Sequence, residues 1–405
     1  MRRMRPTQNT RSVEMTNKDF DFSDIAPHDD SVFRTILDKL IQDPGFLHAI
    51  SYVMPKEEIP ALIDELRRID NRHDFQHRIM FPFLETLAKT TTSGITLGGA
   101  KYYNPALSYT YITNHRDIVL DASFLNLTFL RRGWPTSEVA IGNNLLVFDW
   151  ISDLVRLNNS FIVKRNTGLR EGLEAAKKLS AYIHYAIMEK HESVWIAQRE
   201  GRAKDSSDHT QEALVKMLSL GGQGTFMNKI KEINLMPVSI SYEYDPNDYL
   251  KVKEFLLRRR NPDFKKSQRD DLFSMEIGML QFKGKVHFQL TPRINVRIDE
   301  IGEFKDTNTA AKYVCALIDS AIHRGYEIFP INYVAYDSLH HTERFAHKYT
   351  AEEKKEYLEY FETQLTKIDV ADITEEEHEF MKEMILIMYA NPLKNKLKSI
   401  LGGFE

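Results

Sequence analysis

Apolar residues follow a helical period in the first part of the chain, after an opening stretch that is almost entirely polar. Residues 1–30 are polar and acidic, which predicts a flexible N-terminus. In residues 31–90, apolar positions recur at three- and four-residue spacing, which predicts a helical N-terminal region. The first helix has candidate caps in Asp29, Asp30 and Ser31. We expect helices at 32–43, 56–69 and 74–89.

The period then shortens, and β-branched and aromatic runs alternate with helical stretches as far as about residue 300. Strands that alternate with helices in this way predict an α/β fold, here a mixed sheet flanked by helices, whose ligands bind at the strand ends. Residues 91–300 are therefore expected to form one α/β domain. Strands are predicted at 93–97, 108–112, 139–141, 160–163, 193–197 and 236–242, and helices at 119–132, 171–190 and 211–219.

The last part of the chain combines a charged helix, an expected pair of strands and several amphipathic helices. The charged helix begins beyond Pro246 and carries three consecutive arginines at 258–260. Residues 273–296 have the composition of two strands joined near Gly284. Residues 301–405 are expected to form a mainly helical C-terminal region. Its helices are predicted at 307–323, 351–367 and 376–390, with extended chain at 328–335.

Composition narrows the classes of function and location. The net charge of −4, from 54 Lys and Arg against 58 Asp and Glu, argues against a nucleic-acid partner, which requires a broad cationic face. The single cysteine, Cys315, lies in a predicted buried helix and leaves no internal disulfide possible. No stretch approaches the roughly 18 apolar residues of a membrane-spanning helix. We therefore predict a cytoplasmic protein that is soluble or lies on a membrane surface.

Four short segments carry the candidate chemistry, and the first follows the predicted strand at 108–112. It spans residues 114–121 (NHRDIVLD) and contains His115 with Asp117 and Asp121 close by. A histidine at a strand end can act as general base on a hydroxyl, while a carboxylate fixes its tautomer and stabilises the imidazolium. Taken alone the segment is also compatible with a His–Asp pair that only caps a turn.

The other three segments also lie at strand ends. Residues 160–165 (SFIVKR) form an apolar strand that ends in two cations. Residues 195–205 (WIAQREGRAKD) lead from a strand into a turn in which a glycine permits close backbone approach. Residues 233–238 (INLMPV) contain a proline that marks where a strand starts. The cations of the third segment that are placed to meet a phosphate are Arg199, Arg202 and Lys204.

In order and spacing, the four segments resemble the motif blocks of the glycerol-phosphate and lysophosphatidate acyltransferases. Those blocks are N-H-x-x-x-x-D, G-x-F-F-I-x-R, F-P-E-G-T-R and V-P-[VI]. The resemblance covers roughly residues 90–245, with Asn159 where glycine is usual. The matching residues are Asn114 and His115 in the first block, Phe161, Ile162, Val163 and Arg165 in the second, Glu200 and Gly201 in the third, and Pro237 and Val238 in the fourth.

Two departures from the family pattern affect the assignment of site residues. Five residues separate His115 from Asp121, where the pattern has four, so either Asp121 still reaches the imidazole or Asp117 replaces it. Asp121 is favoured because its apolar neighbours place it on a helix. The family's arginine after Glu-Gly falls on Ala203, which leaves its two cationic neighbours, Arg202 and Lys204, to take the phosphate role.

The resemblance implies direct acyl transfer from a thioester to a glycerol phosphate hydroxyl, as in phospholipid synthesis. His115, supported by Asp121 or Asp117, would remove the hydroxyl proton, and Glu200 would orient a hydroxyl or a backbone group. No metal or cofactor is implied beyond the co-substrate, acyl-CoA or an acyl carrier protein thioester. The residues expected to bind substrate are Asn114, Arg116, Arg165, Gly201, Arg202, Lys204 and Pro237.

The resemblance leaves the acceptor open between glycerol 3-phosphate and 1-acylglycerol 3-phosphate, with a lean towards the second. Lipid substrates imply peripheral membrane contact, for which helix 32–43 and the cationic stretch 256–269 are candidates. A protein kinase is excluded because Ala122 stands where its catalytic loop needs asparagine. A serine hydrolase is disfavoured because G-x-S-x-G is missing from the sequence. The alternative that remains is a non-catalytic lipid-binding or scaffold protein on the same fold.

Overall fold

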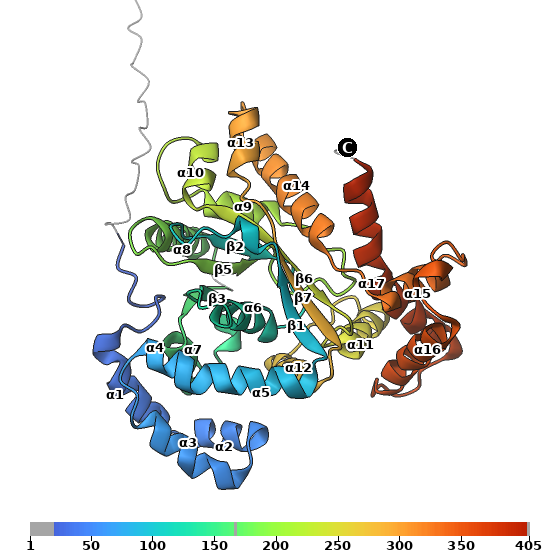
Figure 1. Cartoon of the computed structure of the whole chain (residues 1–405), viewed down its shortest axis with the longest axis horizontal. Helices are drawn as coiled ribbons and strands as arrows, with labels where there is room; N and C mark the ends of the chain where they lie inside the picture. The colour runs from blue at the N-terminus through green and yellow to red at the C-terminus, as the bar shows by residue number, and fades with distance from the viewer. Residues whose placement is uncertain (1–19, 166–167, 403–405) are drawn as a thin grey trace, which may run out of the picture.

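The structure, a computed structural model, describes residues 20–165 and 168–402 and has a seven-stranded mixed sheet at its centre (Figure 1). The strand order is β1-β7-β6-β2-β5-β3-β4. From β6 to β4 all neighbours are parallel, whereas β7 runs antiparallel to β6. The predicted α/β class is thus confirmed. The strands are β1 Gly94–Gly98, β2 Thr110–Thr113, β3 Glu138–Gly142, β4 Ser160–Val163, β5 Val194–Ala197, β6 Leu235–Tyr242 and β7 Lys285–Leu290.

Helices cover both faces of the sheet, because successive strand residues point to opposite sides. Tyr111 belongs to the apolar core on one face, which α5 and α6 cover, and its neighbour Ile112 belongs to the core on the other face. The second face carries α8, α9, α10, α13 and α14. The helices of the two layers are α5 Phe81–Thr91, α6 Leu120–Leu130, α8 Leu169–Met188, α9 Glu212–Leu218, α10 Phe226–Glu232, α13 Asn295–Ile301 and α14 Thr307–Gly325.

The N-terminal region is helical, and its apolar stripe faces inward. The first helix, α1, buries Phe33, Leu37 and Leu40 and packs against α7. Asp29 caps this helix by accepting a hydrogen bond from the backbone N–H of Ser31. Helix α2 was not predicted from the sequence. It starts with an aspartate cap and a proline. The elements are α1 Asp30–Leu40, α2 Pro44–Val53, η2 Lys56–Glu58, α3 Ile59–Leu66, α4 Arg72–Asp74, η3 Phe75–Met80 and α7 Asp149–Leu157.

Part of the segment predicted to be flexible lies against the domain. Of residues 1–30, the first 19 fall outside the described chain, whereas residues 20–29 run beside the edge strand β4. The carbonyl of Ile25 accepts a hydrogen bond from the backbone N–H of Ile162 (2.9 Å), and the Ile25 side chain is buried. Phe22 packs edge-on against Tyr182 of α8. These contacts cover an edge strand that would otherwise expose unpaired backbone groups.

Two predictions for the later part of the chain were wrong. In both cases extended chain was predicted where the structure has a helix. The first half of segment 273–296 is helix α12, which begins at a capping box between Ser267 and Asp270. Segment 328–335 lies largely in α15, which has a proline in its first turn. Both segments contain aromatic and β-branched residues, which favour strands, and these residues are the reason why extended chain was predicted. The remaining elements are α11 Asp248–Arg260, α12 Gln268–Leu280, α15 Pro330–Leu339, α16 Ala351–Thr366, α17 Glu375–Leu401, η4 Ala100–Tyr102, η5 Asn143–Leu145 and η6 Ala346–Lys348.

The parallel strands bring three of the four candidate segments to one edge of the sheet. The carboxyl ends of β2, β4 and β5 lie on the same side, so the residues that follow each strand come close together. The fourth segment differs from the prediction, because Pro237 is the third residue of β6 and pairs with Ile112 inside the sheet. Pro237 has no N–H to donate to the sheet, and its carbonyl accepts a hydrogen bond from the backbone N–H of Thr291.

Candidate active site

The turn after β2 is anchored to the neighbouring strand β6 by the side chain of Asn114. Its amide nitrogen donates to the carbonyl of Ile240 (2.9 Å), and its amide oxygen accepts from the backbone N–H of the same residue (2.8 Å). Asn114 is fully buried and does not line the cavity described below. Its contacts therefore fix the turn, and the predicted role in binding substrate finds no support in its position.

His115 and Asp121 form a close pair in this turn. The distance from His115 Nδ1 to Asp121 Oδ2 is 2.8 Å, and the same oxygen accepts the backbone N–H groups of Arg116 (2.7 Å) and Asp117 (3.1 Å). An ionised carboxylate can only accept hydrogen bonds, so Nδ1 of the imidazole carries the proton and donates it. This arrangement leaves Nε2 as the basic nitrogen. The extra residue between His115 and Asp121 therefore does not prevent their contact.

A tyrosine that no sequence motif pointed to completes the surroundings of Asp121. The hydroxyl of Tyr242, at the end of β6, donates to Asp121 Oδ1 at 3.1 Å. Burial, together with the charge of Asp121, raises the pKa of Tyr242 well above its usual value, so the phenol keeps its proton and remains a donor. Asp121 itself is fully buried. Four donors thus hold one carboxylate behind the imidazole.

Asp117, the alternative partner for the histidine, performs a different task. Its Oδ1 accepts the backbone N–H groups of Val119 (2.9 Å) and Leu120 (2.7 Å), which are free donors at the start of α6. Its Oδ2 accepts from the amide of Asn247 (3.0 Å). Burial, with a smaller contribution from the charge of Asp121, raises the pKa of Asp117. Asp117 caps a helix, and the carboxylate that contacts the histidine is that of Asp121.

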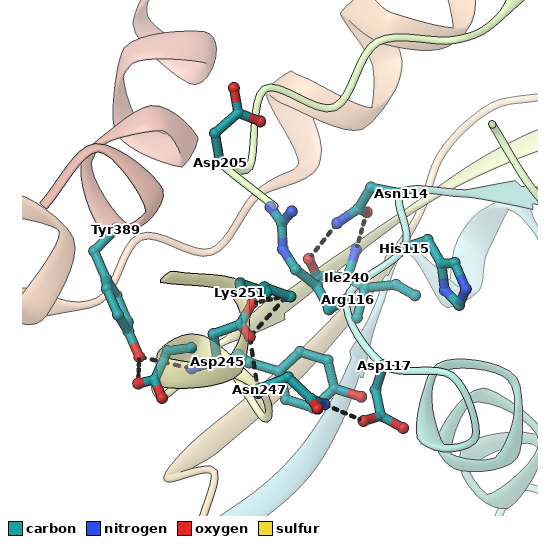
Figure 2. A network of polar contacts seen from close by, with 12 residues as sticks. Asn114, His115, Arg116, Asp117, Asp205, Ile240, Asp245, Asn247, Lys251 and Tyr389 are labelled. Atoms are coloured by element: carbon teal, nitrogen blue, oxygen red, sulfur yellow. Dashed lines mark hydrogen bonds and ion pairs between the residues drawn. The ribbon is translucent and has the colours of Figure 1, made fainter. Parts of the chain in front are cut away.

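Arg116 does not line the cavity described below, so the expectation that it binds substrate finds no support in its position. Its guanidinium forms two hydrogen bonds to the carboxylate of Asp208, at 2.8 and 2.5 Å, and both side chains are buried. Figure 2 shows the imidazole of His115 on the opposite side of the turn from Arg116, Asp117 and the polar network around Asp245. Neighbouring residues of the turn thus point to different sides, His115 towards the cavity and Arg116 and Asp117 towards the protein interior.

The imidazole of His115 borders a large, mainly apolar cavity of about 1730 Å³. The edge of the ring packs against Trp195, with the ring centres 5.8 Å apart. Helices from the N-terminal region and from both sides of the sheet contribute the walls, so the cavity extends well beyond the strand ends. Apolar side chains that line it include Phe46, Ile50, Met80, Phe83, Ile118, Val119, Leu146, Phe148, Trp150, Leu154, Leu214, Met275 and Leu280.

Cationic side chains from two strand ends also border this cavity, and they differ in what they already bind. Lys204 is paired with the buried carboxylate of Glu254 at 2.9 Å, and burial lowers its pKa. Arg165 lies 3.7 Å from Glu200 in a half-exposed pair. Arg202 lines the cavity, and its Nη1 is buried with no hydrogen-bond partner among the described residues. Arg202 is therefore the cation of this group that is most available to an anionic ligand.

The structure also locates the remaining residues of the third and fourth segments. Glu200 lies at the cavity with a largely exposed side chain, and Arg165 is its partner. Gly201 has a φ of 67° and borders the cavity with its backbone, as expected of a glycine in a tight turn. Ala203, at the position where the family has arginine, is buried. Pro237 is buried inside β6 and does not line the cavity, so its expected role in binding substrate is not supported.

Several polar residues around the site came from parts of the chain where the sequence held no local signal. Asp208, Tyr242 and Asn247 each bond to the turn after β2, but they lie far from it in sequence. Arg199 was noted as a cation; it lines the cavity and has a buried Nε without a partner among the described residues. The contacts of Asp208, Tyr242 and Asn247 with this turn could have been predicted only from the strand order.

The two surfaces suggested for membrane contact are largely occupied by internal interactions. The apolar residues of α1, apart from the exposed Val32, belong to the N-terminal core. The three arginines at the end of α11 pair with acidic side chains: Arg258 with Glu254, Arg259 with Glu376 and Arg260 with Glu377. None of the described helices combines the length and the apolar character that crossing a membrane requires.

Comparisons with known proteins do not add a family to these observations. Among residues 20–165 and 168–402, no three His, Cys, Asp or Glu side chains are grouped as a metal site would need. No protein-family model matches this sequence, and no curated protein matches it significantly. The geometry around His115 therefore has to carry any functional conclusion.

Proposed function

We propose that this chain is an O-acyltransferase that moves a fatty acyl group from an acyl thioester to a hydroxyl of a glycerol phosphate. The acceptor is 1-acylglycerol 3-phosphate or glycerol 3-phosphate, and the fold is of the glycerolphosphate acyltransferase kind. The observation that carries the proposal is the His115–Asp121 pair, which faces a largely apolar cavity. A base at the wall of an apolar cavity suits a reaction between a hydroxyl and a fatty acyl thioester.

The chemistry assigned to the pair is general base and then general acid catalysis. Nε2 of His115 takes the proton of the acceptor hydroxyl as that oxygen bonds to the thioester carbonyl carbon. The carbon–sulfur bond then breaks, and the sulfur leaves with the proton from Nε2 as a free thiol. The carboxylate of Asp121 stabilises the imidazolium while it exists and keeps Nδ1 protonated throughout. No covalent acyl-enzyme and no metal are needed in this sequence of steps.

The cations at the cavity supply the binding site for the acceptor phosphate. Arg202 is the principal ligand in this proposal, because its Nη1, like the Nε of Arg199, has no hydrogen-bond partner among the described residues. Arg165, from the end of β4, borders the same cavity and is only weakly paired, so it assists. Lys204 contributes less, because Glu254 already neutralises it. Glu200 holds Arg165 in place and does not reach the imidazole.

The size and lining of the cavity favour an acylated acceptor. Small-molecule sites usually enclose roughly 300–1,000 Å³, and the cavity of about 1730 Å³ exceeds that range. The acyl chain of the donor and the chain of a 1-acylglycerol 3-phosphate can share such a space. Glycerol 3-phosphate has no acyl chain to fill the part of the cavity that the donor's chain leaves empty, so 1-acylglycerol 3-phosphate is the preferred acceptor.

Membrane association is part of the proposal, because both acyl chains have to reach the cavity. Phe148 and Leu280 border the cavity and are 53% and 51% exposed, so they provide apolar contact next to the entrance. The donor is acyl-CoA or acyl carrier protein, and the cations at the strand ends suit the phosphates of either. The expected setting is the cytoplasmic surface of a membrane.

The proposal is tested by CoA release from a long-chain acyl-CoA, with 1-acylglycerol 3-phosphate and glycerol 3-phosphate offered separately to the purified chain. Acceptor-dependent release is expected, faster with the first. Replacement His115→Ala should reduce the rate by about 10²- to 10⁴-fold, the usual contribution of a general base. His347→Ala, an exposed histidine of η6, is the matched control and should have no effect.

Other outcomes are equally informative. Release that persists in His115→Ala would contradict the assigned base. If neither acceptor supports release, the assay is repeated with acyl carrier protein as the donor. Failure with both donors would sink the proposed enzyme and would favour a non-catalytic lipid-binding or scaffold protein.

A further inference from the structure

A buried ion pair connects the turn that carries His115 to the loop that carries the cationic residues of the cavity. Arg116 follows His115 directly, and its backbone N–H shares the carboxylate oxygen of Asp121 with the imidazole. Its guanidinium binds both carboxylate oxygens of Asp208. Asp208 ends the segment that begins at the cavity with Arg199, Arg202 and Lys204. One bidentate contact thus joins the two halves of the site.

Asp208 is itself fixed by helix α14 and by its backbone. The hydroxyl of Tyr326 donates to Asp208 Oδ2 at 2.5 Å, and Nε2 of His323 lies 2.9 Å from the Asp208 carbonyl oxygen. Asp208 is fully buried and has a φ of 49°, a conformation that aspartate and asparagine tolerate better than most residues. The carboxylate therefore has a single position, and both of its oxygens are used by partners.

The C-terminal helix α17 holds the stretch just before Asp208. The amide of Asn391 donates to the carbonyl of Asp205 (2.7 Å), and the amide of Asn395 donates to the carbonyl of Ser207 (3.0 Å). Figure 2 shows Asp205 on the interior side of the turn, away from His115. The loop is thus tied down at its far end, while its first residues stay at the cavity.

From these contacts we infer that Asp208 is a positioning residue, which sets the distance between the basic nitrogen of His115 and the phosphate ligand Arg202. The inference rests on the proposed function. Its physical basis is that acyl transfer needs the acceptor hydroxyl at Nε2 while its phosphate is held elsewhere, so the spacing of the two subsites enters the rate directly. Asp208 contacts neither the cavity nor the reacting groups, and it acts through Arg116 and the loop.

The test replaces Asp208 by asparagine, which keeps the shape and the backbone preference but removes the charge that binds Arg116. In the full-length chain we expect kcat to fall and the KM for 1-acylglycerol 3-phosphate to rise, with kcat/KM lower by about 100-fold, the usual cost of a misplacement near 1 Å. The KM for acyl-CoA should change least. Rates are expressed per folded molecule, so a loss of stability alone would change none of these constants.

The chain offers a closely matched control at the opposite edge of the sheet. Glu138, at the start of β3, is also fully buried and is also bound by one cation, Lys190, and one tyrosine hydroxyl, that of Tyr182. Glu138→Gln should lower the melting temperature about as much as Asp208→Asn but leave kcat and both KM values near those of the wild type. Equal kinetic effects of the two replacements would overturn the inference.

A milder pair of variants covers the case in which Asp208→Asn does not fold. Tyr326→Phe removes one donor to Asp208, and Tyr182→Phe removes the corresponding donor to Glu138. The first should raise the acceptor KM and lower kcat several-fold, whereas the second should change neither. Normal kinetics in Tyr326→Phe would overturn the positioning role. A wild-type chain that shows no acceptor-dependent transfer would overturn the proposed function instead, so the two failures are distinct.

Discussion

The two faces of the turn at residues 114–121 differ in what their polar groups bind. On the cavity face, His115 leaves Nε2 open, with Ile118 and Val119 as apolar neighbours in the cavity wall. On the interior face, Arg116 and Asp117 are buried and bonded to Asp208 and Asn247. The polar residues of this segment, all of them candidate site residues in the sequence, therefore divide into a cavity side and an interior side. A motif match alone does not tell which residue has which task.

The interior face also explains why so many charges can be buried next to the site. A buried ion without a partner is costly, but here the donors and acceptors satisfy one another. Asp245 is bound by Lys251 at 2.7 and 2.6 Å, and its backbone N–H donates to the hydroxyl of Tyr389 on α17. The C-terminal helices thereby stabilise the turn from behind, while the cavity face stays free for ligands.

The largest expected effect separates the two aspartates of the turn. Asp121→Asn should lower kcat by up to about 10⁴-fold, because the histidine then loses the carboxylate that fixes its tautomer. Asp117→Asn should keep most of the activity, since asparagine caps helices about as well as aspartate. The Oδ1 of Asn247 has no partner in the part of the chain that the structure describes, so a rotated amide can accept the new donor. The measurement is CoA release at saturating substrates, and equal losses in both variants would erase the difference between the two faces.

A smaller effect on activity is expected for the replacement of Arg202, which lines the same cavity as His115. Arg202→Gln should raise the KM for the acceptor by about 10- to 150-fold, the equivalent of roughly 1.5–3 kcal/mol for a hydrogen bond to a charged group, with little change in kcat. Lys204→Gln is the matched control and should have a small effect, because Lys204 is already paired with Glu254, which Arg258 also binds. If Lys204→Gln raised the acceptor KM more than Arg202→Gln did, Lys204 would be the principal phosphate ligand.

The smallest effect concerns Lys283, which lies on the interior side near Asp117. Its Nζ donates to the carbonyls of Met279 (2.9 Å) and Gln281 (2.5 Å), and burial, opposed by the charge of Asp117, lowers its pKa from 10.5 to about 8. Between these values the unfolded chain holds a proton that the folded chain has released. The free energy of unfolding should therefore rise with pH in that window, by at most about 1.4 kcal/mol per unit.

This pH dependence is measured by denaturant unfolding at a series of pH values. The rise should become smaller in Lys283→Met but stay unchanged in Lys285→Met, which removes an exposed lysine two residues away. Lys204 and Lys251, whose pKa values burial also lowers, contribute equally in all three proteins. Tyrosines titrate in all three proteins and cancel in the comparison. An identical slope in all three would mean that the folded chain keeps Lys283 protonated.

Much of the architecture could be predicted because it follows from local patterns. The strands that became β2, β5 and β6 are short runs of β-branched and aromatic residues, and their bounds differ from the prediction by two residues at most. The failures also have a local cause. Segment 273–296 contains aromatic residues that resemble a strand, but the capping box at Ser267 starts a helix, in which Phe273 stays exposed.

The sequence predicted the central pair of the candidate site, His115 and Asp121, but not the residues that surround it. The segment after β2 identified His115 and favoured Asp121 over Asp117, and the structure brings that pair to 2.8 Å. The catalytic role of the pair stays a prediction until activity is measured. For Arg116 and Pro237 the expected contact with substrate is not supported, because both are buried and neither lines the cavity.

The sequence by itself determined the alternation of helices and strands, the place of His115 at a strand end and the presence of cations at two others, because each depends on neighbouring residues. Only the tertiary structure decided which polar groups meet. Asp208 lies 92 residues after Arg116, and Asn247 lies 130 residues after Asp117. Such pairs depend on the order of the strands, and that order is set by the packing of two apolar layers against the sheet.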